Sequence, residues 1–334
     1  MARLLFLIIG FKKPSSKKRV LDSIGYIKSK GHDAVVREIP HNLPGQLSLL
    51  KDVGRYDVTI IQKKLFNPVQ FKLMRFFSRK LVFDLDDAVM FHELERNEPF
   101  TGKYFKRFIQ TVRWCDCVIT GNDYLAAFAK AVKGRDERPT VAVLPTPVDT
   151  GALKPKRYDR KGEGVTIGWI GTKGNLSSLE LIREPLKKLM NSYPSLRVKI
   201  ISSDATRIPG LSVDFKPWDA EDEAEDLRSL DIGVMPLEDD LWTRGKGGYK
   251  LLQYMAAGVP AVASPVGINS EIIKDEVNGF LASDGEQWLI KLGRLVEDPQ
   301  LREEIGKAGR ETVESDFSLG RYNERLALLL ENLA

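Results

Sequence analysis

Short apolar runs alternate with amphipathic segments along the chain, and this alternation predicts the elements of an α/β fold. Apolar positions at helical spacing occur, for example, in residues 20–30, 67–80 and 249–257. Strands that alternate with helices favour doubly wound parallel sheets with helices on both faces. The runs typical of buried strands cover residues 4–10, 33–38, 57–62, 81–85, 117–120, 141–144, 165–170, 197–202, 212–215, 232–235 and 260–263.

The chain has 334 residues, which is long for one hydrophobic core and suits two domains. Prolines bracket a turn at residues 145–147, and such a turn is a natural hinge. We therefore expect a first domain over residues 1–148 and a second over 149–315. The loop at residues 11–19 has no Gly-x-Gly-x-x-Gly pattern, which argues against a dinucleotide-dependent dehydrogenase.

The composition excludes several classes of protein. No apolar run approaches the roughly 18 residues of a membrane span, and the N-terminal run is too short for a signal segment, so we expect a cytoplasmic protein. The cysteines are Cys115 and Cys117, at the start of an apolar strand, and the histidines are scattered. We expect buried thiols and no metal cluster.

The charge is distributed unevenly. Residues 1–148 hold 26 Lys and Arg against 15 Asp and Glu, which gives +11, so the remainder holds 25 against 31, which gives −6. A basic first half suggests an anionic partner, either an acidic membrane surface, a lipid-linked phosphate acceptor or a nucleic acid. Nucleic acid is the least favoured partner because no recognition helix, zinc motif or aromatic sheet pattern occurs.

Residues 231–271 are the most informative stretch. A short strand leads into a glycine-containing loop with Arg244 and Lys246, then into a helix with Lys250, a second strand and a glycine turn at 264–269. Loops that follow parallel strands lie on one edge of the sheet, where ligands bind. Cations and outward-pointing N–H groups there would suit a diphosphate. A solvated basic loop before an ordinary core helix is the alternative.

The run KLLQYMAAGVPAVASPVG within this stretch resembles the nucleotide-sugar-binding segment of retaining, family-4-like glycosyltransferases (glycosyl transferases group 1), which have the GT-B fold. That fold implies two Rossmann-like domains facing across a cleft, with residues 316–334 as a terminal helix packing back on the first. The family has two glutamates at positions that Gly245 and Gln253 occupy here. The resemblance implies that Gln253 could still bind the ribose, whereas Gly245 cannot replace the glutamate that holds the sugar. Metal is generally unnecessary in this fold, so no cofactor is expected.

The resemblance also implies which residues meet the donor. Arg244 and Lys250 would neutralise the departing diphosphate. Trp218 lies where relatives pass the nucleobase, although a structural aromatic residue is the alternative. The full set of expected donor-binding residues is Gly171, Thr172, Lys173, Trp218, Lys246, Gln253, Val266, Gly267, Ile268 and Asn269.

Asp86 and Asp87 follow the predicted strand 81–85, where they could act as base, hydrogen-bond acceptor or helix cap. We expect an acceptor-side catalytic role for both. Lys17, Arg19 and Asn122 are expected on the acceptor side as well, with solvated charge as the alternative for the first two.

Residues 67–80 form an aromatic and basic helix with Val69, Leu73, Phe76 and Phe77 on one face. This face could lie on a membrane interface, although crossover helices in α/β sheets have the same pattern.

The resemblance implies a glycosyltransferase that moves a sugar from a nucleotide diphosphate-sugar to a glycan, lipid-linked or other hydroxyl acceptor. The resemblance implies retention of configuration without a metal, and a place in surface polysaccharide or glycoconjugate synthesis. We expect peripheral contact with the inner face of the membrane and no nucleic-acid partner. The alternative is a non-catalytic nucleotide-sugar-binding partner of an active transferase, which the residues at 245 and 253 support. An epimerase is less favoured because no matching pair of His and acid occurs.

Overall fold

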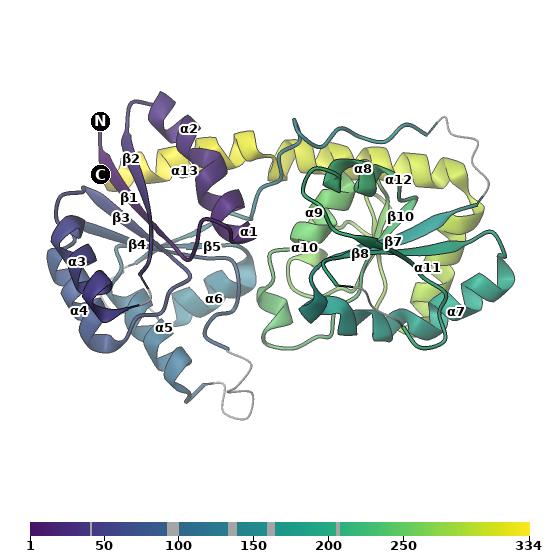
Figure 1. The fold of residues 1–334 in the computed structure, drawn as a ribbon, viewed down its shortest axis with the longest axis horizontal. Helices are drawn as coiled ribbons and strands as arrows, with labels where there is room; N and C mark the ends of the chain where they lie inside the picture. Colours follow the sequence, from purple (N-terminus) through teal and green to yellow (C-terminus); the bar gives the residue numbers. More distant parts are fainter. Residues whose placement is uncertain (41, 92–99, 133–138, 159–163, 205–207) are drawn as a thin grey trace. The chain divides into compact units, whose positions relative to one another are not determined.

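The computed structural model describes residues 1–334 except 41, 92–99, 133–138, 159–163 and 205–207 (Figure 1). The chain forms two compact units. The first contains residues 1–147, 240–247 and 319–334, and the second contains 148–239 and 248–318. The first break lies within a residue of the predicted one. Residues 240–247, which the prediction places in the second domain, belong to the first unit, because their packing partners lie there.

Six parallel strands form the sheet of the first unit, in the order β2-β1-β3-β4-β5-β6. The order changes direction at β1, which gives the carboxyl edge of the sheet a switch point of the kind that binds ligands in doubly wound folds. The strands are β1 (Arg3–Ile8), β2 (Asp33–Glu38), β3 (Val58–Gln62), β4 (Lys80–Leu85), β5 (Cys117–Thr120) and β6 (Thr140–Val143).

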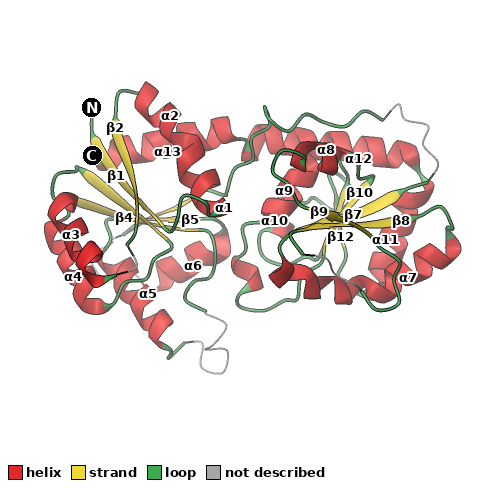
Figure 2. Cartoon of the chain, viewed as in Figure 1, coloured by secondary structure: helices red, strands yellow, loops and turns green. Residues whose placement is uncertain are grey.

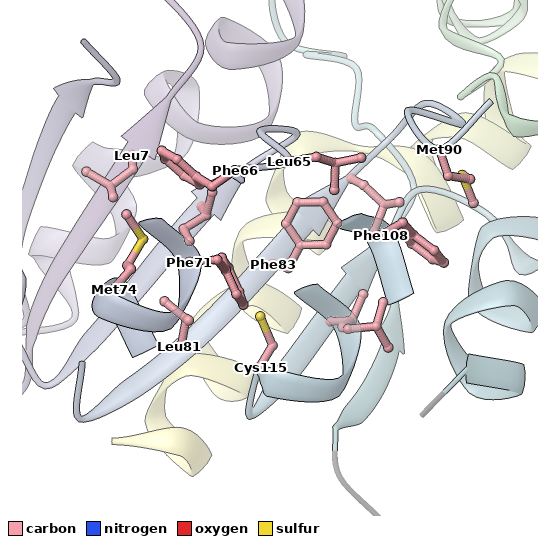
Figure 3. Close-up of a cluster of buried hydrophobic side chains, with 14 of the residues drawn as sticks. Leu7, Leu65, Phe66, Phe71, Met74, Leu81, Phe83, Met90, Phe108 and Cys115 are labelled. Atoms are coloured by element: carbon pink, nitrogen blue, oxygen red, sulfur yellow. The ribbon is translucent and has the colours of Figure 1, made fainter. Parts of the chain in front are cut away.

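Helices cover both faces of this sheet (Figure 2). Alternate residues of β1 belong to different cores: Leu4 packs in a cluster with Leu330, whereas Leu7 packs in a cluster with Phe71 and Phe83 (Figure 3). This alternation follows from the two-residue period of a strand. The helices are α1 (Pro14–Ser16), a π-helical turn (Lys17–Leu21), α2 (Asp22–Ser29), α3 (Leu43–Val53), α4 (Pro68–Phe77), α5 (Lys103–Trp114), α6 (Asp123–Val132) and α13 (Leu319–Leu333).

The second unit repeats this architecture with the strand order β12-β11-β10-β7-β8-β9, again all parallel. The strands are β7 (Thr166–Ile170), β8 (Arg197–Ser202), β9 (Asp214–Pro217), β10 (Ile232–Met235), β11 (Ala261–Ala263) and β12 (Phe280–Leu281). The helices of the second half of the chain are a 3₁₀ stretch (Lys173–Ile182), α7 (Arg183–Ser192), α8 (Glu223–Arg228), a 3₁₀ turn (Thr243–Gly245), α9 (Tyr249–Ala256), α10 (Asn269–Ile272), α11 (Gly285–Glu297), α12 (Pro299–Thr312) and a π-helical turn (Val313–Phe317). Two Rossmann-like units with parallel sheets confirm the predicted fold class.

The two cysteines are free and buried, as predicted. Burial raises the pKa of the Cys117 thiol to about 12. None of the helices among the described residues combines the length and apolar character that a membrane-spanning segment needs.

Candidate functional site

Lys250 reaches the carboxyl end of the central strand of the second unit. It is the second residue of α9, and its Nζ lies 3.8 Å from the centroid of the buried Trp169 ring on β7. The strand continues into Gly171, where an added Cβ would lie 2.7 Å from Trp169 Cη2 and 3.0 Å from Lys250 Nζ. Because Gly171 has no side chain, the ammonium group of Lys250 has room at the carboxyl edge of the sheet. The cation–π contact also stabilises its position.

The start of α9 approaches a second loop of the same edge closely. Gly248 precedes the helix with a φ of 63°, which disfavours residues with a side chain. A Cβ there would also lie 2.8 Å from Ile268 Cγ2 and 2.9 Å from Ile272 Cδ1. Glycine thus brings the positive end of the α9 dipole next to the turn 264–269.

The turn 264–269 presents backbone N–H groups. Gly267 has a φ of 54°, and Val266 N donates to Ser264 O over 2.8 Å. Within the described part of the chain, the amides of Gly267 and Ile268 have no hydrogen-bond partner. Successive free N–H groups at a left-handed residue form a concavity that binds anions. Asn269 is fully buried, and its Nδ2 donates to Ser264 O over 3.1 Å, which holds the turn closed.

Trp218 and Gln253 both donate hydrogen bonds to the carboxylate of Glu223, a residue that the sequence analysis did not identify. Glu223, the first residue of α8, accepts from Trp218 Nε1 and from Gln253 Nε2, each over 2.9 Å. In the sequence it stands among other acids, so nothing distinguished it. Thr172 and Lys173 are exposed, with Thr172 directly before the 3₁₀ stretch and Lys173 as its first residue.

In the first unit, Asp86 and Asp87 share one lysine. Lys63 follows β3 with a φ of 55°, and its Nζ lies 2.8 Å from Asp86 Oδ1 and 2.5 Å from Asp87 Oδ2. Burial raises the pKa of Asp87, although Lys63 opposes the shift, and the neighbouring Asp86 adds to it. No described helix begins directly after these residues, so the helix-cap alternative is wrong.

The loop 240–247 lies against this pair of carboxylates. An added Cβ at Gly245 would lie 2.5 Å from Ala88 Cβ and 2.8 Å from Ala88 N. The charge of Lys246 is close enough to lower the pKa of Asp87. The structure therefore brings Lys246 close to the acidic pair of the first unit, while Arg244 on the same loop is exposed.

Asn122 holds this loop and is itself fully buried. Its Nδ2 donates to Arg244 O over 3.2 Å and to Lys246 O over 3.1 Å, while its Oδ1 accepts from Leu125 N over 2.9 Å. Because both ends of the amide are engaged, the structure gives Asn122 a role inside the unit rather than the expected contact with an acceptor.

Arg19 is also committed to the interior. It is 1% exposed, and its Nη2 lies 2.5 Å from Asp84 Oδ1, while Nη1 donates to Leu144 O over 2.8 Å and to Thr146 Oγ1 over 3.2 Å. Burial alone would lower the pKa of Arg19, but the Asp84 carboxylate reverses this effect and the pKa is raised. The expected acceptor contact of Arg19 is therefore replaced by a buried ion pair. Lys17 is exposed, and its Nζ lies 2.6 Å from Asp22 Oδ1.

Among the described residues, no group of three or more His, Cys, Asp or Glu side chains could hold a metal ion. What the geometry does offer is a set of anion-binding groups on the second unit and an acidic pair beside a basic loop on the first.

Comparisons with known proteins concern the fold and the sequence of the second half of the chain. Residues 165–298 match the model of the family described as Glycosyl transferases group 1. The chain is 31% identical over 162 residues to the sulfoquinovosyl transferase SQD2 of Arabidopsis thaliana, a match that covers 45% of this chain and 29% of that protein. The matched segment thus spans less than a third of this relative.

Solved structures match the whole chain. HepE of Anabaena, in complex with UDP-glucose, superimposes with a TM-score of 0.78 at 16% identity, over 99% of this chain and 100% of that one. Sucrose-phosphate synthase of Thermosynechococcus elongatus gives a TM-score of 0.71 at 13% identity, over 100% and 99% of the two chains. At such identities the likeness concerns the fold. The chain therefore has the two-domain fold of GT-B glycosyltransferases, and its residues 165–298 are similar to the domain described as Glycosyl transferases group 1.

Proposed function

We propose that this protein is a glycosyltransferase that takes a sugar from a nucleotide diphosphate-sugar and transfers it to a hydroxyl acceptor. The observation that carries the proposal is the placement of Lys250 over Trp169 on α9, together with the unbonded amides of Gly267 and Ile268 in the turn that Gly248 approaches at the start of the same helix. A fixed cation and fixed N–H donors at one edge bind a diphosphate. HepE, which shares the fold, was solved with UDP-glucose, and this supports a donor of that class.

The same groups would accelerate the reaction. The bond from the anomeric carbon to the diphosphate breaks, and negative charge collects on the departing phosphate. Lys250 and the turn amides stabilise that charge without first reorienting, and electrostatic stabilisation of this kind is commonly the largest contribution to catalysis. We propose that no metal or cofactor takes part, and that the anomeric configuration is retained, as the family resemblance implies. The contact of Arg244 and Lys246 with the diphosphate stays a prediction.

We propose that the acceptor binds the first unit near Asp86 and Asp87. A carboxyl group with a raised pKa is suited to accept a hydrogen bond from an incoming hydroxyl and, transiently, its proton. Lys63 fixes both carboxylates, and Lys246 keeps the charge near balance. The acceptor is a glycan or a lipid-linked sugar in this proposal, in the synthesis of a surface polysaccharide or glycoconjugate.

We propose that α4 contacts the anionic inner face of the membrane through an exposed apolar face. Such a contact would place the protein where a lipid-linked acceptor lies. The helix buries Phe71 and Met74, but Val69, Phe76 and Phe77 are 69%, 80% and 45% exposed. Large apolar side chains grouped on one exposed helix face are typical of interaction surfaces. Exposed cations on and beside the helix, Lys64, Lys72, Arg79 and Lys80, complement anionic lipid.

Vesicle sedimentation tests this contact. We expect binding to vesicles that contain phosphatidylglycerol and weak binding to vesicles of phosphatidylcholine alone. Phe76→Ser should reduce binding to the anionic vesicles, whereas Leu328→Ser, at an equally apolar exposed position on α13, should not. Equal loss in both variants would contradict the assignment to α4.

Thermal stabilisation by UDP, GDP and ADP tests the donor site. A ligand at about a hundred times its dissociation constant adds about 2.7 kcal/mol of stability. We expect one nucleotide to stabilise the wild type but not Lys250→Ala. Lys188→Ala removes the same charge from an exposed position on α7 and should behave like the wild type. If no nucleotide stabilises the wild type, the donor assignment is wrong.

A non-catalytic nucleotide-sugar-binding partner is the second candidate. Gly245 favours it, because the contact with Ala88 leaves no room for the glutamate that the family places there. Incubation with the nucleotide-sugar that stabilises best, with and without acceptor, separates the two. Release of nucleoside diphosphate supports the transferase, and binding without any release supports the partner.

A further inference from the structure

Glu223, which no sequence pattern singled out, is a carboxylate held in a fixed orientation by two neutral donors. Its Oε2 accepts from Trp218 Nε1, and its Oε1 accepts from Gln253 Nε2, each over 2.9 Å. Gln253 is 5% exposed and lies on α9, while Trp218 follows β9. Because each oxygen has its own donor from a different element, the carboxylate cannot rotate without losing one of these bonds.

The charge of this carboxylate is not balanced by a cation. Its acidic neighbours on α8 are paired: Asp226 with Lys216 over 2.7 Å, and Glu225 with Arg228 over 2.8 Å. In the part of the chain that the structure describes, no Lys or Arg forms an ion pair with Glu223. A carboxylate has about four positions at which it accepts hydrogen bonds, and two are occupied here. The remaining positions suit two neighbouring hydroxyl donors.

Trp218 adds a flat apolar surface beside this carboxylate. Its Nε1 is engaged, yet the side chain is 45% exposed. An indole fixed through its nitrogen keeps its ring plane in place, and aromatic faces of this kind stack on nucleobases of any sequence. The indole of Trp218 can thus stack on a base, and the carboxylate of Glu223 can accept hydrogen bonds from hydroxyls next to that base.

The position of Gln253 connects this pair to the proposed phosphate site. Gln253 follows Lys250 by three residues on α9, so the two lie on the same side of the helix, about 4.5 Å apart along its axis. A nucleoside diphosphate carries its base, its vicinal ribose hydroxyls and its phosphates in that order. Trp218, Glu223 and Lys250 present matching chemistry in the same order.

We propose that Glu223 binds the two ribose hydroxyls of a nucleoside diphosphate, with Trp218 stacking on the base and Gln253 as a positioning residue. The inference rests on the proposed function and moves the ribose contact from Gln253 to Glu223. A carboxylate only accepts hydrogen bonds, so Gln253 must turn its amide nitrogen toward Glu223. A glutamate at 253 would instead place a second negative charge at hydrogen-bond distance, which accounts for the amide at this position.

Isothermal titration calorimetry with UDP, GDP and ADP, and with the 2′-deoxy form of whichever binds, tests this role. We expect the wild type to bind the ribonucleotide about tenfold to a hundredfold more tightly than the deoxy form, the range for a hydrogen bond to a charged group. Glu223→Gln should lose this discrimination. Gln253→Glu should weaken binding, because it sets two carboxylates against each other. The double variant Glu223→Gln/Gln253→Glu restores one carboxylate and one amide, and should recover most of the affinity.

The outcomes distinguish failure of the proposed function from failure of the assignment of Glu223 alone. If the wild type binds no nucleoside diphosphate, the proposed function and this inference are both overturned. If it binds, but the ribo and deoxy forms bind equally, only the inference is overturned. A merely structural role for Glu223 would weaken both forms by the same factor in Glu223→Gln, and that result would also overturn it. Melting temperatures of all variants confirm that they are folded.

Discussion

Gly245 offers a direct test of why this chain lacks a glutamate at a position where the family that it resembles has one. Gly245→Ala adds a single Cβ, which would lie 2.5 Å from Ala88 Cβ and 2.8 Å from Ala88 N. Neither neighbour is the flexible end of a side chain, so the loop 240–247 or the backbone at Ala88 must move. Overpacking of this kind costs about 1–3 kcal/mol.

Gly25→Ala is the matched control, because it makes the same chemical change in the same unit. Gly25 is exposed in the middle of α2, and a Cβ there meets nothing within 4 Å. Alanine in a helix interior is favoured over glycine by about 0.5–1 kcal/mol, so this variant should be more stable than the wild type.

Thermal unfolding followed by circular dichroism measures both variants. For a unit of this size, about 1 kcal/mol shifts the melting temperature by about 2–4 °C. Gly245→Ala should therefore melt about 2–12 °C below the wild type, and Gly25→Ala about 1–4 °C above it. If Gly245→Ala melts at or above the wild-type temperature, position 245 tolerates a side chain, and steric exclusion does not explain the missing glutamate.

Two further predictions concern charges in the first unit. Arg19→Met leaves Asp84 buried without its partner and should lower the free energy of unfolding, measured in urea, by about 3–5 kcal/mol. The double variant Arg19→Met/Asp84→Leu should recover most of this stability. A loss below about 1 kcal/mol in the single variant would contradict the importance of the pair. The backbone N–H of Arg3 donates to Asp57 Oδ2 over 2.8 Å and lowers the pKa of Asp57 in the folded protein. The stability that Asp57 contributes is therefore fully present above its pKa in the unfolded chain, about 3.9. This stability is lost as the pH falls through the lower pKa of the folded protein. Asp57→Asn should be less stable than the wild type at pH 7, and the difference should shrink below about pH 4; a difference that does not change with pH would speak against this account.

The fold was predictable because each element has a local pattern. The apolar runs at 232–235 and 260–263 became β10 and β11, since a strand buried on both faces is apolar throughout. The first loop was harder to predict. Residues 17–21 form a π-helical turn instead of an open loop, because Arg19 points into the core toward Asp84, and no local pattern announces a buried charge.

Glycines and cations that lie close together in the sequence, as in residues 244–250, could be recognised as candidates for a site, and their contact with a ligand stays a prediction. Contacts between distant segments could not be predicted in this way. Asn122 binds the loop 240–247, and Glu223 binds Gln253 thirty residues away. In the sequence Asn122 is one polar residue after a strand, and Glu223 is one acid among several. The sequence made Asn122 an acceptor-side candidate and did not single out Glu223. Only the folded chain shows what each of them contacts, because their partners come from other elements.

The division of the first unit into three chain segments has a consequence for synthesis on the ribosome. Its sheet is complete by residue 143, but α13 supplies Tyr322, Leu326 and Leu330 to the core, and Tyr322 Oη donates to Arg19 O over 2.9 Å. At about 5–20 residues per second, roughly 10–30 seconds pass between translation of residue 147 and residue 319. During that time the part of the first core that α13 covers in the finished protein lacks this cover, while the second unit is still being made. The unit that begins first is thus finished last, and until then it exposes apolar side chains that α13 later covers.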